Sequence, residues 1–133
     1  MAFYGKFFAV EREENYEAFV KSMGLSEEKE KKFLQFKPVQ KYEKKGDEYV
    51  FTIQTPEGEK NTKFKSGVEF TSTFRDRPMT TTITVDGNKI TQVIKFESGF
   101  TMTIKKEYTD DTLSEELTHS KWDGTARRFF KAQ

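Results

Sequence analysis

The spacing of apolar residues follows a helical period before residue 37 and alternates after it. Between residues 15 and 23 the apolar positions recur at i, i+3, i+4 and i+7, as Tyr16, Phe19, Val20 and Met23. This spacing predicts an amphipathic helix, for which Asn15 is a suitable N-cap and Gly24 a suitable end. A short strand is expected before it, and a long run of strands after the helical region.

A second helix is predicted from Ser26 to about residue 36. Ser26 is a suitable N-cap, and Pro38 ends the helix because proline disfavours the helical conformation of the residue before it. Residues 26–32 contain no apolar side chain, so this helix can attach only through Phe33, Leu34 and Phe36. We therefore expect a helical cap over about residues 15–36, whose second helix is held mainly by its last turn.

The rest of the chain has the pattern of short strands joined by tight turns. Turn signals recur roughly every ten residues and include Asp86-Gly87, Asp76-Arg77-Pro78 and Trp122-Asp123-Gly124. Phenylalanine supplies 14 residues and every threonine follows residue 50, which favours strands. With one strand before the helices and about nine after them, the pattern predicts an all-β barrel or two-sheet clam, which limits exposed edges.

Alternation along the predicted strands places several polar side chains on apolar faces. Thr81, Gln92, Lys106 and Glu115 each share a face with apolar neighbours. The last strand, Ala126-Arg127-Arg128-Phe129-Phe130, must turn one of its two arginines inward. Because an unpaired buried charge costs several kcal/mol, the pattern indicates either a wet cavity or an ion-pair network in a partly filled core. A hollow barrel that holds one ligand fits this set of residues.

Composition excludes several classes of function. The 133 residues are the size of one domain (1–133), and the net charge of +1 is not the basic balance typical of nucleic-acid binding. The absence of cysteine and the single histidine, His119, exclude thiolate zinc sites, cysteine nucleophiles and two-histidine metal sites; His119 is expected at the surface or in a loop. The mean hydropathy is −0.83, and no apolar stretch approaches the roughly 20 residues that a membrane-spanning helix requires. With no cysteine and no signal-like N-terminus, a cytoplasmic location is expected.

Several segments follow the pattern of a known family. They are Gly5-Lys6-Phe7, Asn15-Tyr16-Glu17-Ala18-Phe19-Val20, Phe64-Lys65-Ser66-Gly67-Val68-Glu69-Phe70, Thr84-Val85-Asp86-Gly87-Asn88-Lys89 and Arg128-Phe129-Phe130-Lys131. Over essentially its whole length the chain resembles the intracellular fatty-acid-binding proteins (cytosolic lipid-binding proteins), and it is most similar to the insect gut members. The resemblance implies a ten-stranded antiparallel up-and-down barrel (a β-clam) of the calycin type, with a two-helix cap inserted after strand one and a cavity for lipid.

The resemblance also implies a site for a lipid carboxylate. Many members of the family hold it with two inward basic residues and a tyrosine, and at these positions stand Lys106, Arg128 and Phe130. Lysine lacks the bidentate fork of arginine, and Phe130 has no hydroxyl, so this clamp is incomplete. Glu115 stands at a position that is usually apolar in the family, where it can pair with Lys106 or with Arg128.

These observations lead to the hypothesis of a non-enzymatic, monomeric cytosolic carrier that binds a long-chain fatty acid without cofactor or metal. The carboxylate would lie near Lys106, Arg128 and Phe130. Polar cavity residues would be Gln92, Glu115, Thr81 and Tyr108. The expected apolar lining consists of Tyr16, Phe19, Phe51, Ile53, Phe64, Phe70, Met102 and Ile104. The alternatives are a carrier of a neutral or retinoid-like lipid, and a filled barrel that acts as a protein-interaction module.

Lipid entry is expected through the helical cap. The second helix is the candidate for the part that moves, because residues 26–32 offer no apolar docking, and by resemblance to the family the turns at Pro56-Glu57-Gly58 and Asp76-Arg77-Pro78 would complete the portal. Lys29, Lys31 and Lys32 on that helix are most simply a solvated face, and transient contact with anionic membranes is the functional alternative. No nucleic-acid partner is expected.

Overall fold

The described part of the chain folds into ten strands and two helices. The computed structural model describes residues 2–74 and 77–133. In chain order the elements are β1 (Phe8–Glu14), α1 (Tyr16–Ser22), α2 (Glu27–Gln35), β2 (Val39–Lys45), β3 (Glu48–Thr55), β4 (Gly58–Phe64), β5 (Phe70–Phe74), β6 (Arg77–Asp86), β7 (Lys89–Phe96), β8 (Thr101–Tyr108), β9 (Thr112–His119) and β10 (Trp122–Ala132).

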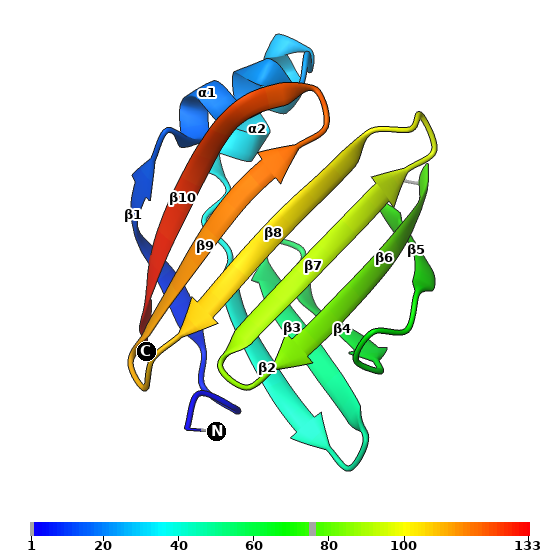
Figure 1. Cartoon of the computed structure of the whole chain (residues 1–133). Coiled ribbons are helices and arrows are strands. Elements are labelled where there is room, and N and C mark those ends of the chain that lie inside the picture. The colour runs from blue at the N-terminus through cyan, green and yellow to red at the C-terminus, as the bar shows by residue number, and fades with distance from the viewer. Residues whose placement is uncertain (1, 75–76) are drawn as a thin grey trace.

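The strands form one antiparallel sheet in the order β4-β3-β2-β1-β10-β9-β8-β7-β6-β5. Neighbours in this order are also neighbours along the chain, except that β1 pairs with β10 and so joins the two ends of the chain. The sheet curves into a nearly closed barrel with β4 and β5 as its edges (Figure 1). The predicted ten-stranded up-and-down barrel with a cap after strand one is confirmed.

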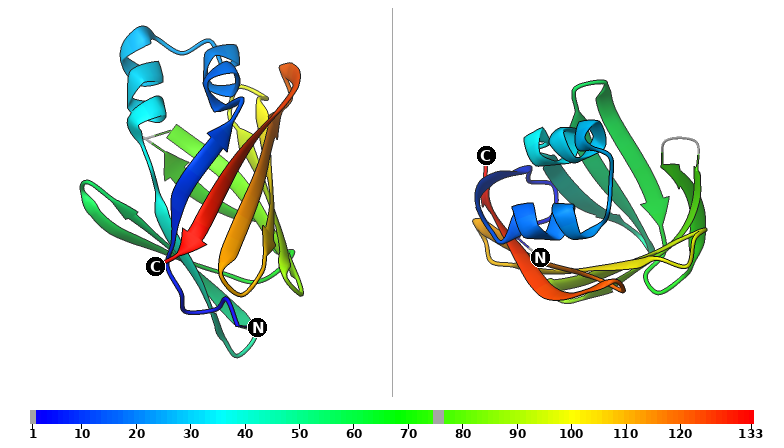
Figure 2. Two further views of the ribbon diagram at one scale, coloured as in Figure 1. Left: turned by 90° about the vertical axis from the view of Figure 1, so that its left-hand side faces the viewer. Right: turned by 90° about the horizontal axis from the view of Figure 1, so that it is seen from above.

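The two helices lie across one end of the barrel (Figure 2). Helix α1 packs against β10 and against α2, with Tyr16, Phe19 and Val20 buried. Ser26 caps α2 as predicted, since the backbone N–H of Lys29 donates to its hydroxyl at 3.3 Å. No residue of α2 is buried, so α2 is the more loosely attached of the two helices.

Asn15 stands at the predicted N-cap position of α1 but makes a different contact, and one predicted turn is misplaced. Asn15 does not cap α1 with its side chain: it adopts a left-handed conformation (φ 57°) and its Nδ2 donates to the carbonyl of Thr125 at 3.1 Å. The last hairpin turns at residues 120–121, and Trp122-Asp123-Gly124 instead begin β10, where the pairing shifts register before Ala126. Gly124 serves packing there, because a Cβ on it would lie 2.3 Å from the Trp122 ring.

The proposed turn at Asp76-Arg77-Pro78 lies partly outside the described residues. Asp76 is not among them, whereas Arg77 and Pro78 begin β6. Pro56 and Glu57 form the turn between β3 and β4, as the sequence predicts, and Gly58 begins β4 with a positive φ of 120°. Glycine suits this position because it adopts positive φ without a steric penalty.

Aromatic side chains close one end of the barrel. The side chains in the rest of the interior do not fill it completely. Phe3 stacks on Tyr108 with ring centroids 4.1 Å apart, and the N-terminal end of the chain lies at the end of the barrel opposite the helices (Figure 1). Above this floor, several side chains share the inward faces with buried residues and yet keep part of their surface accessible: Phe51, Ile53, Phe70, Gln92, Met102 and Ile104. Because inward side chains retain accessible surface, the interior is not a fully packed core.

Candidate functional site

A buried ion pair joins β8 and β9. Lys106 and Glu115 are direct cross-strand partners and are 3% and 5% exposed. The Lys106 Nζ lies 3.5 Å from Glu115 Oε2 and donates to Gln40 Oε1 and to the Tyr42 hydroxyl, each at 2.9 Å. Gln40 also donates from Nε2 to Glu115 Oε2 at 3.0 Å. Gln40 on β2 therefore bridges the cation and the anion across the barrel.

Aromatic rings complete the surroundings of Lys106. Its Nζ lies 4.5 Å from the Phe51 ring centroid and 4.9 Å from that of Tyr42. Burial lowers the pKa of Lys106, and the Glu115 carboxylate opposes this change. The three protons of the ammonium thus face three acceptors, on Gln40, Tyr42 and Glu115. Lys106 is inward, as alternation predicts, but it is fully engaged by the protein itself.

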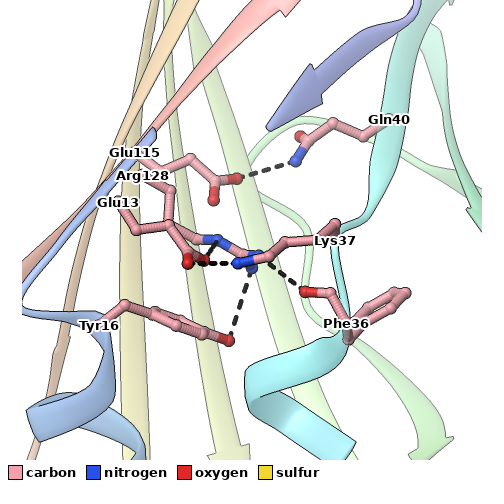
Figure 3. A network of polar contacts seen from close by, with 7 residues as sticks. All are labelled: Glu13, Tyr16, Phe36, Lys37, Gln40, Glu115 and Arg128. Carbon is pink, nitrogen blue, oxygen red and sulfur yellow. Dashed lines mark hydrogen bonds and ion pairs between the residues drawn. The ribbon is translucent and has the colours of Figure 1, made fainter. Parts of the chain in front are cut away.

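A second buried cation, Arg128 on β10, lies at the root of the helical cap (Figure 3). It is 4% exposed, and its Nε lies 2.9 Å from Glu13 Oε2. Nη2 donates to the Phe36 carbonyl at 2.8 Å, and the guanidinium carbon lies 4.3 Å above the Tyr16 ring. These partners come from the residues just before α1, at its start and just after α2. One arginine therefore contacts both ends of the cap.

Of the two adjacent arginines, the inward one is Arg128. Arg127 points to the outer face, where its Nη2 lies 3.8 Å from Glu116 Oε2 and its side chain is half-exposed. In the β10–β9–β8 register, Glu115 stands between Arg128 and Lys106. Glu115 nevertheless pairs with Lys106, while Arg128 has its own carboxylate in Glu13. The sequence left these two pairings open.

The sequence analysis missed Gln40 and Tyr42 beside Lys106, and Glu13 beside Arg128. A shift of register between Val10 and Arg12 places an extra residue in β1, after which Glu13 stands opposite Arg128. Such a bulge reverses which alternate residues face inward. Glu13 also contacts Lys37 Nζ through its other oxygen, Oε1. No signal in the polar segment before α1 distinguishes Glu13 from Glu11 or Glu14.

The other predicted polar residues, Thr81, Tyr108 and Gln92, also lie inside the barrel, but they take part in neither ion pair. Thr81 and Tyr108 are buried, and neither hydroxyl has a hydrogen-bond partner within the described part of the chain. Burial raises the pKa of Tyr108, so its hydroxyl remains protonated and can donate. Gln92 stands between Ile83 and Ile104 in the ladder and is half-buried. Free hydroxyls in a partly filled interior suit a bound polar ligand group or water.

The predicted apolar residues divide into two groups. Phe130 and Phe64 belong to the buried cluster around Tyr42 and Tyr108, and Phe51 and Phe70 pack against it. Tyr16 and Phe19 belong to the cluster under α1, against which Met102 and Ile104 pack. Ile53 is half-buried on the same face as Phe51. The two cationic centres therefore lie in a barrel whose inner walls are largely apolar.

His119 lies inside the protein, contrary to the expected surface position. It is 6% exposed at the end of β9, and its ring lies 5.4 Å from that of Phe19 and 4.8 Å from that of Phe100. Nδ1 accepts from the backbone N–H of Lys121 at 3.1 Å, and Nε2 faces the Ser22 hydroxyl at 2.7 Å. Ser22 donates in turn to the Phe19 carbonyl at 2.6 Å. These partners assign a neutral ring with its proton on Nε2.

This chain of hydrogen bonds predicts a pH dependence of stability. Burial, together with the nearby Lys121 ammonium, lowers the pKa of His119. Between the two pKa values, His119 is protonated in the unfolded chain but neutral in the folded protein. The free energy of unfolding should therefore fall as the pH drops below about 6.5. The fall should end below the lowered pKa of the folded state. Protonation would also bring the Nδ1 proton against the N–H of Lys121.

Chemical denaturation between about pH 5.5 and 7.5 measures this effect. Because His119 is the chain's single histidine, the variant His119→Gln should show a flatter profile than the unmodified protein over this interval. Lys121→Gln keeps the backbone N–H that donates to Nδ1 but removes the ammonium that helps to lower the pKa of His119, so its profile should lie between those of the other two proteins. Equal slopes in the unmodified protein and in His119→Gln would contradict the assignment.

Comparison with known proteins identifies the family. The model of the lipocalin / cytosolic fatty-acid binding protein family matches residues 1–118. The chain belongs to this family. Fatty acid-binding protein 1 of Manduca sexta is 45% identical to it over 133 residues, which cover 99% of this chain and 100% of that protein. Fatty acid-binding protein 2 of the same insect is 42% identical over the same share.

Solved structures of fatty-acid-binding proteins have the same fold. The structure of the fatty-acid-binding protein isolated from Manduca sexta matches with a TM-score of 0.89 at 42% identity, over 98% of this chain and 99% of that chain. A Schistosoma mansoni fatty acid binding protein in complex with arachidonic acid matches with a TM-score of 0.85 at 22% identity, which bears on the fold alone. The resemblance to insect members of the family is thus confirmed over nearly the whole chain.

The described residues contain neither a cluster of metal ligands nor a membrane-spanning helix. Within residues 2–74 and 77–133, no three His, Asp or Glu side chains are grouped as a metal ion would require. None of the helices described is long and apolar enough to cross a membrane.

Proposed function

We propose that the protein is a non-enzymatic, monomeric carrier in the cytosol that binds a long-chain fatty acid inside the barrel, with the carboxylate near Lys106 and Arg128. The observation that supports this most directly is a buried arginine beside a partly filled apolar interior. The Nε of Arg128 lies 2.9 Å from Glu13 Oε2, although the N–H is not aligned for a hydrogen bond with it. Transfer of the acyl chain from water contributes about 0.8 kcal/mol per CH₂, and Arg128 supplies the charge that a carboxylate needs.

A neutral or retinoid-like lipid is the second candidate ligand. Both interior cations already have a carboxylate partner, Glu115 for Lys106 and Glu13 for Arg128. Phe130 also lacks the hydroxyl that would complete the family's clamp. A neutral headgroup would leave both ion pairs undisturbed. A filled barrel that acts only as a protein-interaction module is less favoured, because the inward side chains keep accessible surface.

Native mass spectrometry of the expressed protein distinguishes these functions. A carrier should retain a co-purified lipid or take up added oleate, and the mass of the retained lipid gives its class. A neutral lipid at stoichiometric occupancy, with no uptake of oleate, would favour the second candidate. A protein that is bare as isolated and takes up neither oleate nor oleyl alcohol would contradict the carrier function.

The same proposal includes entry of lipid past α2. This helix has no buried residue and packs on α1, whereas its C-terminal end is fixed by the bond from Arg128 to the Phe36 carbonyl. A segment with few buried apolar contacts opens at low free energy. The turn between β3 and β4, and the start of β6 at Arg77 and Pro78, complete the proposed portal.

Amide hydrogen exchange should reveal this opening. In the empty protein we expect fast exchange over residues 27–32, slowed by bound oleate, because a ligand stabilises the closed state. Residues 102–106 of β8 should stay protected throughout and serve as the internal control. Exchange in α2 as slow as in β8, without response to lipid, would show that entry occurs elsewhere.

A transient contact with anionic membranes is also proposed, through Lys29, Lys31 and Lys32. All three are exposed on α2. Each basic residue near an anionic surface contributes about 1 kcal/mol. The acidic first turn, Glu27, Glu28 and Glu30, opposes this attraction, and Lys32 lies 3.7 Å from Glu28. The contact is therefore expected to be weak.

A further inference from the structure

The carboxylate of Glu13 lies beside Arg128, at the position where the carboxylate of a bound fatty acid is proposed to lie. We propose that Glu13 is a resident carboxylate that the headgroup of a fatty acid replaces at Arg128, and that Glu13 thereby sets how strongly the protein prefers fatty acids to neutral lipids. This inference rests on the carrier function proposed above. It concerns a residue that reaches the interior only because of the bulge in β1.

Arg128 is the interior cation that has hydrogen-bond capacity to spare. The Lys106 ammonium has three protons, and they face Gln40, Tyr42 and Glu115. A guanidinium has five N–H groups. Those of Arg128 reach the Phe36 carbonyl at 2.8 Å and the Tyr16 hydroxyl at 3.5 Å, while Nε–H is not aligned with any acceptor in the part of the chain described. Glu13 therefore neutralises the charge of Arg128 without using all its donors.

Glu13 is placed so that it can leave Arg128 and keep a partner. Its Oε2 lies near Arg128, whereas its Oε1 contacts Lys37 at the exit of the cap (Figure 3). The side chain of Glu13 is 19% exposed and that of Lys37 is 50% exposed. Glu13 also lines a groove of about 680 Å³ on the cap, together with Tyr16 of α1 and Leu34 of α2. A displaced Glu13 would remain paired with Lys37 and partly hydrated.

The replacement affects acids and neutral lipids differently. A ligand carboxylate beside Glu13 would bring two like charges together at one guanidinium, so binding requires that Glu13 move. A hydroxyl or ester headgroup creates no such repulsion and leaves the ion pair intact. Glu13 is thus expected to weaken the binding of fatty acids while leaving the binding of fatty alcohols of equal chain length unchanged.

Titration calorimetry with oleate and oleyl alcohol tests this assignment. Glu13→Gln should tighten oleate binding about tenfold, the factor expected if Arg128 is free of Glu13 about a tenth of the time, and should leave oleyl alcohol unchanged. Glu14→Gln is the matched control, since this neighbouring carboxylate is exposed and pairs with Arg12. A thermal melt of each variant confirms that it is folded at the temperature of the titration.

Substitution of Lys37 provides a second, independent test of the same inference. Lys37→Gln should weaken oleate binding about two- to fivefold, as for loss of a partly exposed ion pair, because the displaced Glu13 would lack a partner. In the double variant Glu13→Gln/Lys37→Gln this loss should shrink, which reports coupling between the two side chains. Lys45→Gln, an exposed lysine at the end of β2, controls for the general loss of positive charge.

The outcomes separate the inference from the carrier function. If the unmodified protein binds both lipids but Glu13→Gln changes neither affinity, or changes both equally, the role of Glu13 is overturned and the carrier function stands. If oleate binds more weakly to Glu13→Gln than to a folded unmodified protein, Glu13 assists the ligand instead of competing with it, and the inference is again overturned. If the unmodified protein binds neither lipid, the carrier function and the inference both fail.

Discussion

Replacing Lys106 with methionine is expected to lower the free energy of unfolding of the empty protein by about 3–5 kcal/mol. The substitution keeps a long side chain but removes the cation from the buried pair with Glu115. Glu115 is 5% exposed, so its carboxylate cannot reach bulk solvent, which would screen the charge that is left unpaired. Gln40 and Tyr42 each lose a hydrogen bond to Lys106 as well. Denaturant titration monitored by circular dichroism measures the change.

Lys105→Met is the matched control for this experiment. Lys105 is the next residue of β8 and points to the outer face, where it is exposed. Substitutions at exposed positions usually change stability by less than about 0.5 kcal/mol. The double variant Lys106→Met/Glu115→Leu should be less destabilised than the sum of its two single variants, because no charge is left unpaired. Equal losses for Lys106→Met and Lys105→Met would show that the buried pair contributes nothing to stability.

The alternation of apolar and polar residues along the strands correctly predicted many of the residues that face the interior. A strand's side chains point to opposite faces in turn, so the apolar neighbours of Lys106 and Glu115 were sufficient to place both residues inside. The same rule could not choose between Arg127 and Arg128, because apolar residues stand on both sides of that pair. The burial of Arg128 follows from the register of β10 against β9, which only the structure provides.

The residues that the sequence did not reveal depend on departures from regular pairing. Glu13 faces inward because β1 contains a bulge, and nothing in a run of charged residues marks where one residue will be extra. His119 follows the inward period of β9, but it lies next to the polar turn at residues 120–121, which suggested exposure. The contact of Arg128 with the Phe36 carbonyl uses a backbone atom, so no residue type could have indicated it.

The second large effect concerns the charge of Arg128. If this residue holds the carboxylate, Arg128→Ala should weaken the binding of palmitate by about 1.5–3 kcal/mol, the range for hydrogen bonds to charged groups. The affinity for hexadecanol should change less, because an alcohol does not need the positive charge. Glu13 would lose its partner on the inner side but retain Lys37 on the outer side, so we expect the variant to fold.

Two further variants show whether the loss arises from the guanidinium itself. Arg127→Ala removes the same charge from the outer face of the same strand and should leave both affinities unchanged. Arg128→Lys keeps a positive charge but has neither Nε–H nor the planar fork, so its affinity for palmitate should lie between those of the unmodified protein and of Arg128→Ala. Titration calorimetry at one ionic strength measures all three variants. An equal loss of affinity for palmitate and hexadecanol in Arg128→Ala would mean that Arg128 supports the shape of the cap through Tyr16 and Phe36, and that the headgroup is bound elsewhere.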